Sequence, residues 1–326
     1  MNKEMNRDRL IRLYNKFGIE IILAVLLVIC AMTSPVFLTQ ANIVNLLSQI
    51  AVVTIITCGM TMLIIAGQTD LSGGAIVALT GCVCVGTYKD LAESGMSGIL
   101  AAVIAVGVAI IVGIIINVIA GIVVAKFNAP AFIVTLATMK VGRGICYIYT
   151  EGVPIYDIGN ISKLGQGRIG GILPYSVIIM VICIVASWFI LMKMRLGRHI
   201  YAVGGNVEAA KASGISSGST IIKAYIIHGI FIGIAGALFM TRINSGQPAE
   251  ANGLEFDAIT AAVIGGASLA GGVGGMSGSI IGSIIIGVIT NILTLKSVQS
   301  YYQMIITGVI IVVAVILNIL TKEKKD

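Results

Sequence analysis

Charged side chains are rare in this 326-residue chain, and a few of them stand inside or beside long apolar stretches. Lys140 and Arg143 are three residues apart, so they share one face of a helix. Charges at membrane depth are costly, and they usually pair with one another or line a water-filled cavity. We therefore expect Lys140 and Arg143 to form a structural ion pair with a carboxylate such as Asp257 or Glu151, rather than to bind a ligand.

Asp70 lies in a polar break between two apolar runs, and two interpretations remain open. It can cap a helix that starts at Leu71, with Ser72 and Gly73 easing the turn. It can also face a cavity as a gate at membrane depth. The cap is favoured, because the charges of the loops place this break near a membrane face. The two roles are compatible.

Three amides, Asn117, Asn291 and Gln303, lie inside apolar runs. Amides both donate and accept hydrogen bonds, so they suit hydroxyl-rich ligands. More often they bond across neighbouring membrane helices, at about 0.6 kcal/mol each. Asn291 is the candidate for a translocation pathway among them. His228 stands alone on an apolar helix and is expected to be a satisfied packing residue rather than a proton relay.

The sequence offers no recognisable catalytic or metal site. It contains neither an HExxH motif nor a phosphate-binding GxxxxGK[ST] loop, so ATP would have to be bound by another chain. All six cysteines lie in apolar runs, which predicts buried thiols rather than metal ligands or disulfides. We predict no enzyme activity, no metal and no cofactor of its own.

These side chains must be positioned by membrane helices. The chain is 57% hydrophobic and 11% charged with a mean hydropathy of +1.04, which excludes an ordinary soluble domain. At roughly 20 residues per span there is room for about ten helices, and the apolar runs do not alternate as barrel strands do. The expected fold is an all-α polytopic membrane protein with about ten transmembrane helices and a short cytoplasmic helix.

The predicted spans are 18–38, 43–66, 71–88, 98–124, 129–149, 171–192, 220–241, 256–271, 276–294 and 302–320. Of these, 256–271 is either a span or a re-entrant element. Basic residues cluster at the N-terminus, in 193–219 and at the C-terminus, as is typical of cytoplasmic loops. We expect a multi-pass protein of the cell membrane with both termini cytoplasmic. It would comprise a cytoplasmic segment 1–17, a membrane domain 18–321 and a tail 322–326.

Residues 202–215 form a polar island between apolar runs. Asn206 can cap a helix start, Glu208 adds a negative charge to its first turn, and Gly214 suits the position after its end. The resulting helix has about two turns, too few to be stable without a surface to dock on. The island is either a plain connector or a docking segment.

The island resembles the coupling segment of permeases from ribose-type ABC importers, with its Gly-Gly-Asn, Glu-Ala-Ala and Ser-Gly-Ile pattern. Further similar segments follow the family's order: GQTDLSGGAIVALTG (67–81), the Pro-Phe-Ile-x-Thr-Leu type run of 128–155, GLEFDAITAAVIGGASLAGGVGG (253–275) and SYYQMIITG (300–308). The resemblance implies that the island contacts an ATPase subunit through Gly204, Gly205, Asn206, Glu208, Ala209, Ala210, Ser213 and Gly214. Departures from the family pattern are Lys140, Val273 and Lys211.

The resemblance implies a permease subunit that moves a monosaccharide such as ribose. Its partners would be a cytoplasmic ATP-binding subunit, an extracellular or periplasmic binding protein and a second permease copy, with no nucleic acid. Permeases for branched-chain amino acids or nucleosides are a near alternative. An ion-driven carrier is a remote one, because only Asp70 and Asp257 approach the acidic relay that it would need.

A weak internal echo links 67–81 with 264–279, since both place glycines and hydroxyls between apolar runs. Interrupted helices in corresponding halves indicate a transporter's midplane pathway. The predicted pathway residues are therefore Asp70, Gly74, Gly266 and Asn291.

Overall fold

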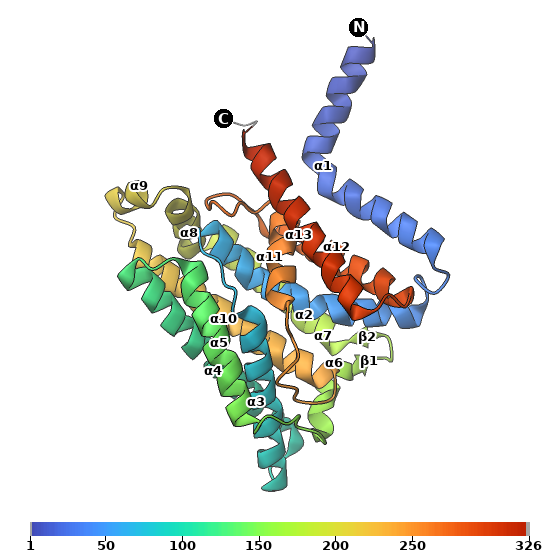
Figure 1. Ribbon diagram of the computed structural model, residues 1–326, viewed down its shortest axis with the longest axis vertical. Helices are drawn as coiled ribbons and strands as arrows, with labels where there is room; N and C mark the ends of the chain where they lie inside the picture. The colour runs from blue at the N-terminus through green and yellow to red at the C-terminus, as the bar shows by residue number, and fades with distance from the viewer. Residues whose placement is uncertain (1, 324–326) are drawn as a thin grey trace.

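Ten helices in the computed structural model, which describes residues 2–323, correspond to the ten predicted apolar segments (Figure 1). They are α1 (Asn2–Thr33), α2 (Gln40–Ile65), α3 (Gly73–Glu93), α4 (Gly98–Phe127), α5 (Ala131–Tyr149), α7 (Tyr175–Lys193), α10 (Ser217–Arg242), α11 (Leu254–Ile264), α12 (Met276–Leu295) and α13 (Ser300–Glu323). Seven are long and apolar enough to cross a membrane, while α11 has 11 residues. The all-α polytopic class is confirmed, and ten crossings stays a prediction.

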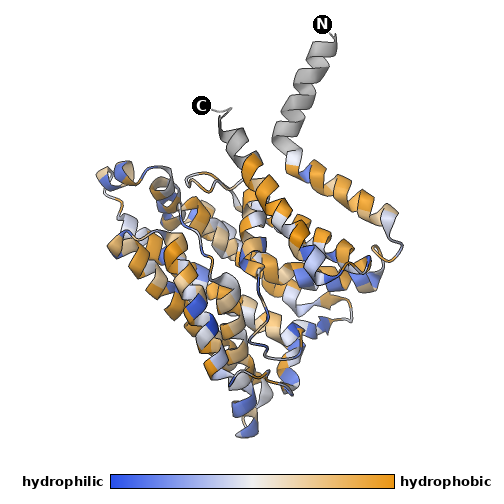
Figure 2. Ribbon diagram, viewed as in Figure 1, coloured by the Kyte–Doolittle hydropathy of each residue, from blue (hydrophilic) through white to orange (hydrophobic). Residues whose placement is uncertain are grey.

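Helix α2 is the core of the bundle. Of its most apolar window, 94% is buried, against 22% for α4 and 17% for α5. A helix that is hydrophobic all round belongs in an interior. The outer helices α4 and α5 instead expose large apolar side chains such as Ile111 and Phe132, and Figure 2 shows how many residues of the bundle are apolar. In a membrane this outer surface suits lipid, because each helix satisfies its own backbone hydrogen bonds.

One end of the bundle carries the short helices α8 (Arg195–Gly205) and α9 (Val207–Ala212). There α2 ends against the loop 265–275, where the Gly272 amide donates to the Ile65 carbonyl at 2.8 Å. The Tyr201 hydroxyl donates to the Gly274 carbonyl at 2.8 Å, and burial raises the pKa of this tyrosine. The loop is thereby fixed to both α2 and α8.

The opposite end carries residues 150–174, which contain the 3₁₀ turn η1 (Gly159–Ser162), the short helix α6 (Lys163–Gln166) and a small hairpin. In the hairpin, β1 (Arg168–Ile169) pairs antiparallel with β2 (Leu173–Pro174), with Ile169 opposite Leu173. A bridge between Ile155 and Gly246 ties this end to the segment that follows α10.

Close helix crossings occur at glycines of α10 and α12. A Cβ on Gly229 would overlap Gly113 of α4, and one on Gly233 would meet Ile110. A Cβ on Gly282 of α12 would likewise overlap Ala261 of α11. Backbones approach this closely only where small residues stand, so these glycines have a structural role in helix packing.

Helices α3 and α11 both start inside the bundle after irregular segments, 66–72 and 243–253. Asp70 lies against His228, which at 1.5 Å per residue is about 16 Å from the first residue of α10 and about 21 Å from its last. The break is therefore near mid-depth. The expectation that it lies near a membrane face is wrong, because 66–72 returns from the end of α2 into the bundle without forming a helix.

The internal echo paired the wrong segments. Residues 265–275 are the loop between α11 and α12, at the end of the bundle that carries α8. The neighbour of 67–74 at mid-depth is the start of α11, where Gly74 meets Ala251 and Glu255.

Candidate functional site

The polar island forms the capped helix that its sequence predicts. Asn206 accepts from the Ala209 amide at 2.9 Å as the N-cap of α9, and Gly214 has a φ of 78° beyond its end. Glu208 and Lys211 form an ion pair at 2.9 Å, with side chains 81% and 53% exposed. Helix α9 thus presents an ion pair and a helix start to the surroundings.

The sequence did not reveal α8, which precedes this helix. A Cβ on Gly204, the last residue but one of α8, would overlap the Ile65 carbonyl, so Gly204 packs on the end of α2. Ala210 is buried too. The other predicted coupling residues are exposed: Gly205, Asn206, Glu208, Ala209, Ser213 and Gly214. The surface available to a partner is therefore the outer side of α9 and its flanks.

A second polar group lies at the centre of the bundle. Asp70 and His228 are both fully buried, and Asp70 Oδ2 lies 3.0 Å from His228 Nε2. Asp70 Oδ1 accepts from the Ser72 amide at 2.7 Å and from the Ser72 hydroxyl at 2.5 Å. Asp70 therefore stabilises the irregular segment before α3 through hydrogen bonds. Helix α3 begins at Gly73, two residues later than the predicted start at Leu71. His228 is a packing residue with a charged partner that the sequence did not indicate.

Glu255 joins the starts of the two interrupted helices. This carboxylate is 5% exposed, lies in the first turn of α11 and accepts from the Gly74 amide of α3 at 3.1 Å. Helix N-termini carry a partial positive charge, so one carboxylate stabilises both. A Cβ on Gly74 would overlap the Glu255 carboxylate and the Ala251 carbonyl. The structure thus gives Gly74 a packing role, beside its proposed place on the pathway.

The predicted ion pairing of Lys140 and Arg143 with Asp257 is wrong for the part of the chain that the structure describes. Arg143 instead binds backbone and amide oxygens of the segment before α11. Its guanidinium donates to the Pro248 carbonyl, to the Glu250 carbonyl at 2.8 Å and to Asn252 Oδ1 at 2.6 Å. A planar guanidinium can serve several such acceptors at once. Lys140, one turn away, is exposed.

Two other pathway candidates have clear local settings. Asn291 exchanges two hydrogen bonds with Asn42 of α2, at 2.9 and 3.1 Å, and both amides are buried. This is the bond across helices that was weighed against a pathway role, and it engages the polar atoms of Asn291. Gly266 has a φ of 90° in the loop after α11, where an added Cβ would meet no other part of the protein within 4 Å.

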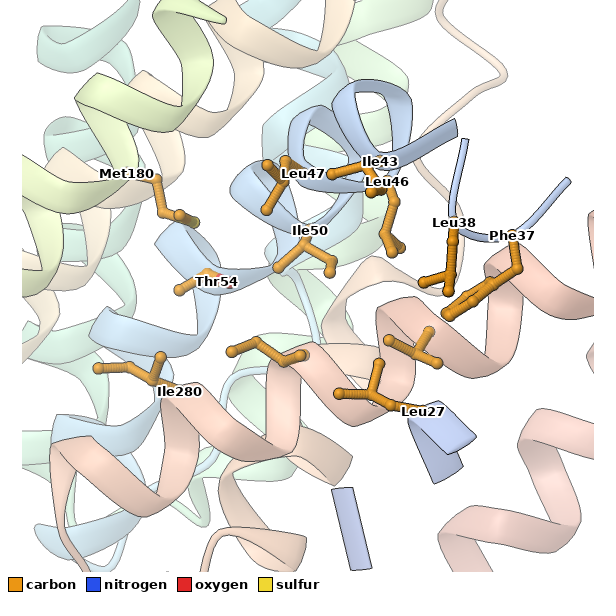
Figure 3. Close-up of a pocket in the computed structure, with 12 residues that line it drawn as sticks. Leu27, Phe37, Leu38, Ile43, Leu46, Leu47, Ile50, Thr54, Met180 and Ile280 are labelled. Atoms are coloured by element: carbon orange, nitrogen blue, oxygen red, sulfur yellow. The ribbon is translucent and has the colours of Figure 1, made fainter. Parts of the chain in front are cut away.

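Two cavities differ in what they can hold. One, of about 310 Å³, lies among apolar side chains of α1, α2, α7, α12 and the loop before α2 (Figure 3). Its hydroxyl group, on Thr54, is bonded to Ser283 at 2.7 Å, so the cavity offers little to a polar solute. The smaller, of about 90 Å³, is lined in part by Gln49, Arg242 and Asp257. It has room for about three water molecules.

Comparisons with known proteins agree with this architecture. The family described as "Branched-chain amino acid transport system / permease component" matches residues 42–315. The ribose import permease protein RbsC of Bacillus subtilis (strain 168) is 38% identical over 98% of this chain and 97% of its own length. The same-named protein of Escherichia coli (strain K12) is 40% identical over 91% of this chain and 92% of its own.

The L-arabinose transport system permease protein AraH of Escherichia coli (strain K12) is 33% identical over 94% of this chain and 91% of its own length. No solved structure matches the chain. The family covers α2 to α13, including both interrupted helices and the exposed island. The chain therefore belongs to this family of transport permeases, as a multi-pass ABC permease of the ribose type and not an enzyme.

Proposed function

We propose that this chain is the permease subunit of an ABC importer for a monosaccharide such as ribose. The relatives with the highest identities reported above are named as ribose and L-arabinose permeases and align over more than nine-tenths of the chain. The observation that carries the proposal is α9, a capped and exposed helix too short to be stable without a docking surface. The partner on that surface is a separate ATPase, which binds the ATP, so this chain needs no cofactor.

We infer that the end with α8 and α9 is cytoplasmic. Basic residues gather there, on α8 and α9 and at the nearby ends of α4, α7 and α10: Lys126, Lys193, Arg195, Arg198, Lys211 and Lys223. Cytoplasmic loops carry such an excess. The start of α1 and the end of α13 lie toward the same upper part of Figure 1 as α8 and α9, which supports cytoplasmic termini. The opposite end, with residues 150–174, then meets the binding protein.

A second permease copy is inferred from the exposed face of α5. Lys140 is the middle residue of this helix and is exposed. A lysine at the centre of a membrane helix costs about 2.5–3.5 kcal/mol against lipid. Arg143 also holds the irregular segment 248–252 to the same helix, and irregular backbone is not tolerated in lipid. The face is therefore covered by water and protein, with the solute path between two copies.

Reconstitution tests the function. The chain is placed in proteoliposomes with its partner ATPase and binding protein, and uptake of labelled ribose is followed with and without ATP. Uptake that requires ATP and both partners is expected. Gradient-driven uptake by this chain alone would support an ion-driven carrier instead. If the binding protein selects a branched-chain amino acid or a nucleoside, the importer class stands and the sugar is wrong.

A further inference from the structure

Helix α9 and helix α10 are joined rigidly. Residues 213–216 connect them, and the Ile215 amide returns to the Ala210 carbonyl at 3.0 Å across Gly214. Ser216 then caps α10 by accepting from the Ser219 amide at 3.3 Å. Both ends of the connection are thus fixed by hydrogen bonds, so a displacement of α9 is passed on to α10.

Helix α10 in turn contacts the irregular segment 66–72 through a side-chain hydrogen bond between His228 and Asp70. Gly59 of α2 leaves room for the imidazole of His228, because a Cβ there would overlap its ring. His228 Nδ1 is buried without a hydrogen-bond partner among the described residues, so the ring proton is assigned to Nε2, which donates to Asp70. With two donors from Ser72, the Asp70 carboxylate accepts three hydrogen bonds.

The segment that Asp70 holds reaches two further helices. The Leu71 amide donates to Thr135 Oγ1 of α5 at 3.1 Å, and the Gly74 amide binds Glu255 at the start of α11. A shift at Asp70 therefore moves the starts of α3 and α11 and the adjoining part of α5. Helix α5 carries the exposed face with Lys140, along which we propose the solute path.

The other contacts of α10 are of a different kind. Its glycines cross α4 and α3 at fixed backbone contacts, for example Gly233 on Ile110 and Gly236 on Val77. Such crossings join regular helices, whereas the His228 contact reaches irregular backbone, which can change its dihedral angles without unwinding a helix. A buried polar pair is also weak as a source of stability, since an apolar pair of similar volume often serves as well.

We propose that Asp70 and His228 are positioning residues that couple movement of α9 and α10 to the solute path. The proposal rests on the proposed function, because it needs an ATPase that moves α9. Neither side chain has to touch the solute. Their contribution is the connection itself, so a variant that keeps the hydrogen bond should work and one that removes it should uncouple ATP hydrolysis from transport.

Three variants separate the connection from folding. Asp70→Asn keeps an acceptor for Ser72, and its amide can donate to the other tautomer of His228, so the tie survives without charge. His228→Gln keeps a donor of similar reach to Asp70. Asp70→Asn combined with His228→Leu removes the tie and leaves no unpaired charge in the core, which would otherwise destabilise the fold. The control is Thr54→Val with Ser283→Ala, which removes another buried hydrogen bond away from the route.

Each variant is reconstituted with its ATPase and binding protein, and labelled ribose uptake is divided by ATP hydrolysed. The two variants that keep the hydrogen bond, and the control, should keep the native ratio of uptake to ATP hydrolysis within about twofold. In the double variant without the hydrogen bond, this ratio should fall about tenfold or more while the ATPase remains bound. A native ratio of uptake to ATP hydrolysis in the double variant would overturn the proposal. Failure of the double variant alone to assemble would overturn it too. Native protein without ATP-driven uptake would instead contradict the proposed function.

Discussion

The backbone amide of Gly74 donates to Glu255 Oε2 at 3.1 Å, so the first turns of α3 and α11 share one buried carboxylate. The two residues are 181 positions apart. Their contact joins the two halves of the chain where both helices are interrupted, and it explains why a carboxylate is retained at this depth. Each helix start supplies partial positive charge to it.

Replacing Glu255 by Gln should lower the stability of the protein. The amide keeps an acceptor for Gly74 but loses the charge that both helix starts stabilise, at a cost of about 1–2 kcal/mol. Thermal unfolding of the purified protein in detergent measures this. Glu250→Gln, on an exposed position, is the matched control and should leave the melting temperature unchanged. Equal melting temperatures for all three proteins would contradict the shared-charge explanation.

Gly74→Ala should impair folding and assembly rather than transport alone. The added Cβ would overlap the Ala251 carbonyl and the Glu255 carboxylate, and relief of such overlap costs about 1–3 kcal/mol. Yield and co-purification with the ATPase report the effect. Gly107→Ala on α4, where an added Cβ would meet no atom of another helix within 4 Å, should behave as the native protein. Full assembly with blocked uptake would return Gly74 to a pathway role.

Arg143→Lys should reduce transport despite keeping the charge. An ammonium lacks the planar fork that serves Pro248, Glu250 and Asn252 together, so the segment before α11 loosens. We expect uptake to fall about tenfold with assembly retained, consistent with the cost of misplaced positioning groups. Arg242→Lys, which loses one side-chain contact to Asn45, is the milder control. Similar uptake in both variants would argue against a role for the Arg143 contacts in holding the segment before α11.

Glu208→Arg should abolish ATPase binding while membrane insertion continues. The change puts a positive charge at a helix start that already carries partial positive charge, on a side chain 81% exposed. Lys211→Ala breaks the same ion pair without that reversal and should retain the ATPase. Co-purification and uptake are measured for both. Normal co-purification of the Glu208→Arg variant would remove α9 from the ATPase contact.

The orientation is tested by single cysteines in a background lacking the six native ones. Ser213→Cys, beside α9, should react with a membrane-impermeant maleimide only from the cytoplasm. Ser94→Cys, after α3, should react only from outside. Both serines are exposed, so access to the reagent depends on the side of the membrane. Labelling of both from one side would require an odd number of crossings to be added or removed between them.

The sequence by itself determined the class of protein and its local signals. Long apolar runs fix membrane helices, because backbone groups in lipid must be satisfied within each segment. The Asn206 cap and the Gly214 stop depend on neighbours within a few residues, so they too were readable. The pattern Leu196, Ile200 and Val203 has the spacing of one face of a helix and is the sequence signal for α8.

The tertiary structure alone decided which polar groups meet. Asp70 binds His228, which is 158 positions away, and Asn42 binds Asn291, which is 249 positions away. No local pattern in the sequence indicates partners that are so far apart. Arg143 was assigned a carboxylate because a buried charge needs a partner, yet irregular backbone near α11 supplied the oxygens instead. Hydropathy also reports how apolar a segment is and not whether it is helical. Inside the bundle neighbouring helices can satisfy an extended backbone, so the interruptions before α3 and α11 became visible only once the helices were packed together.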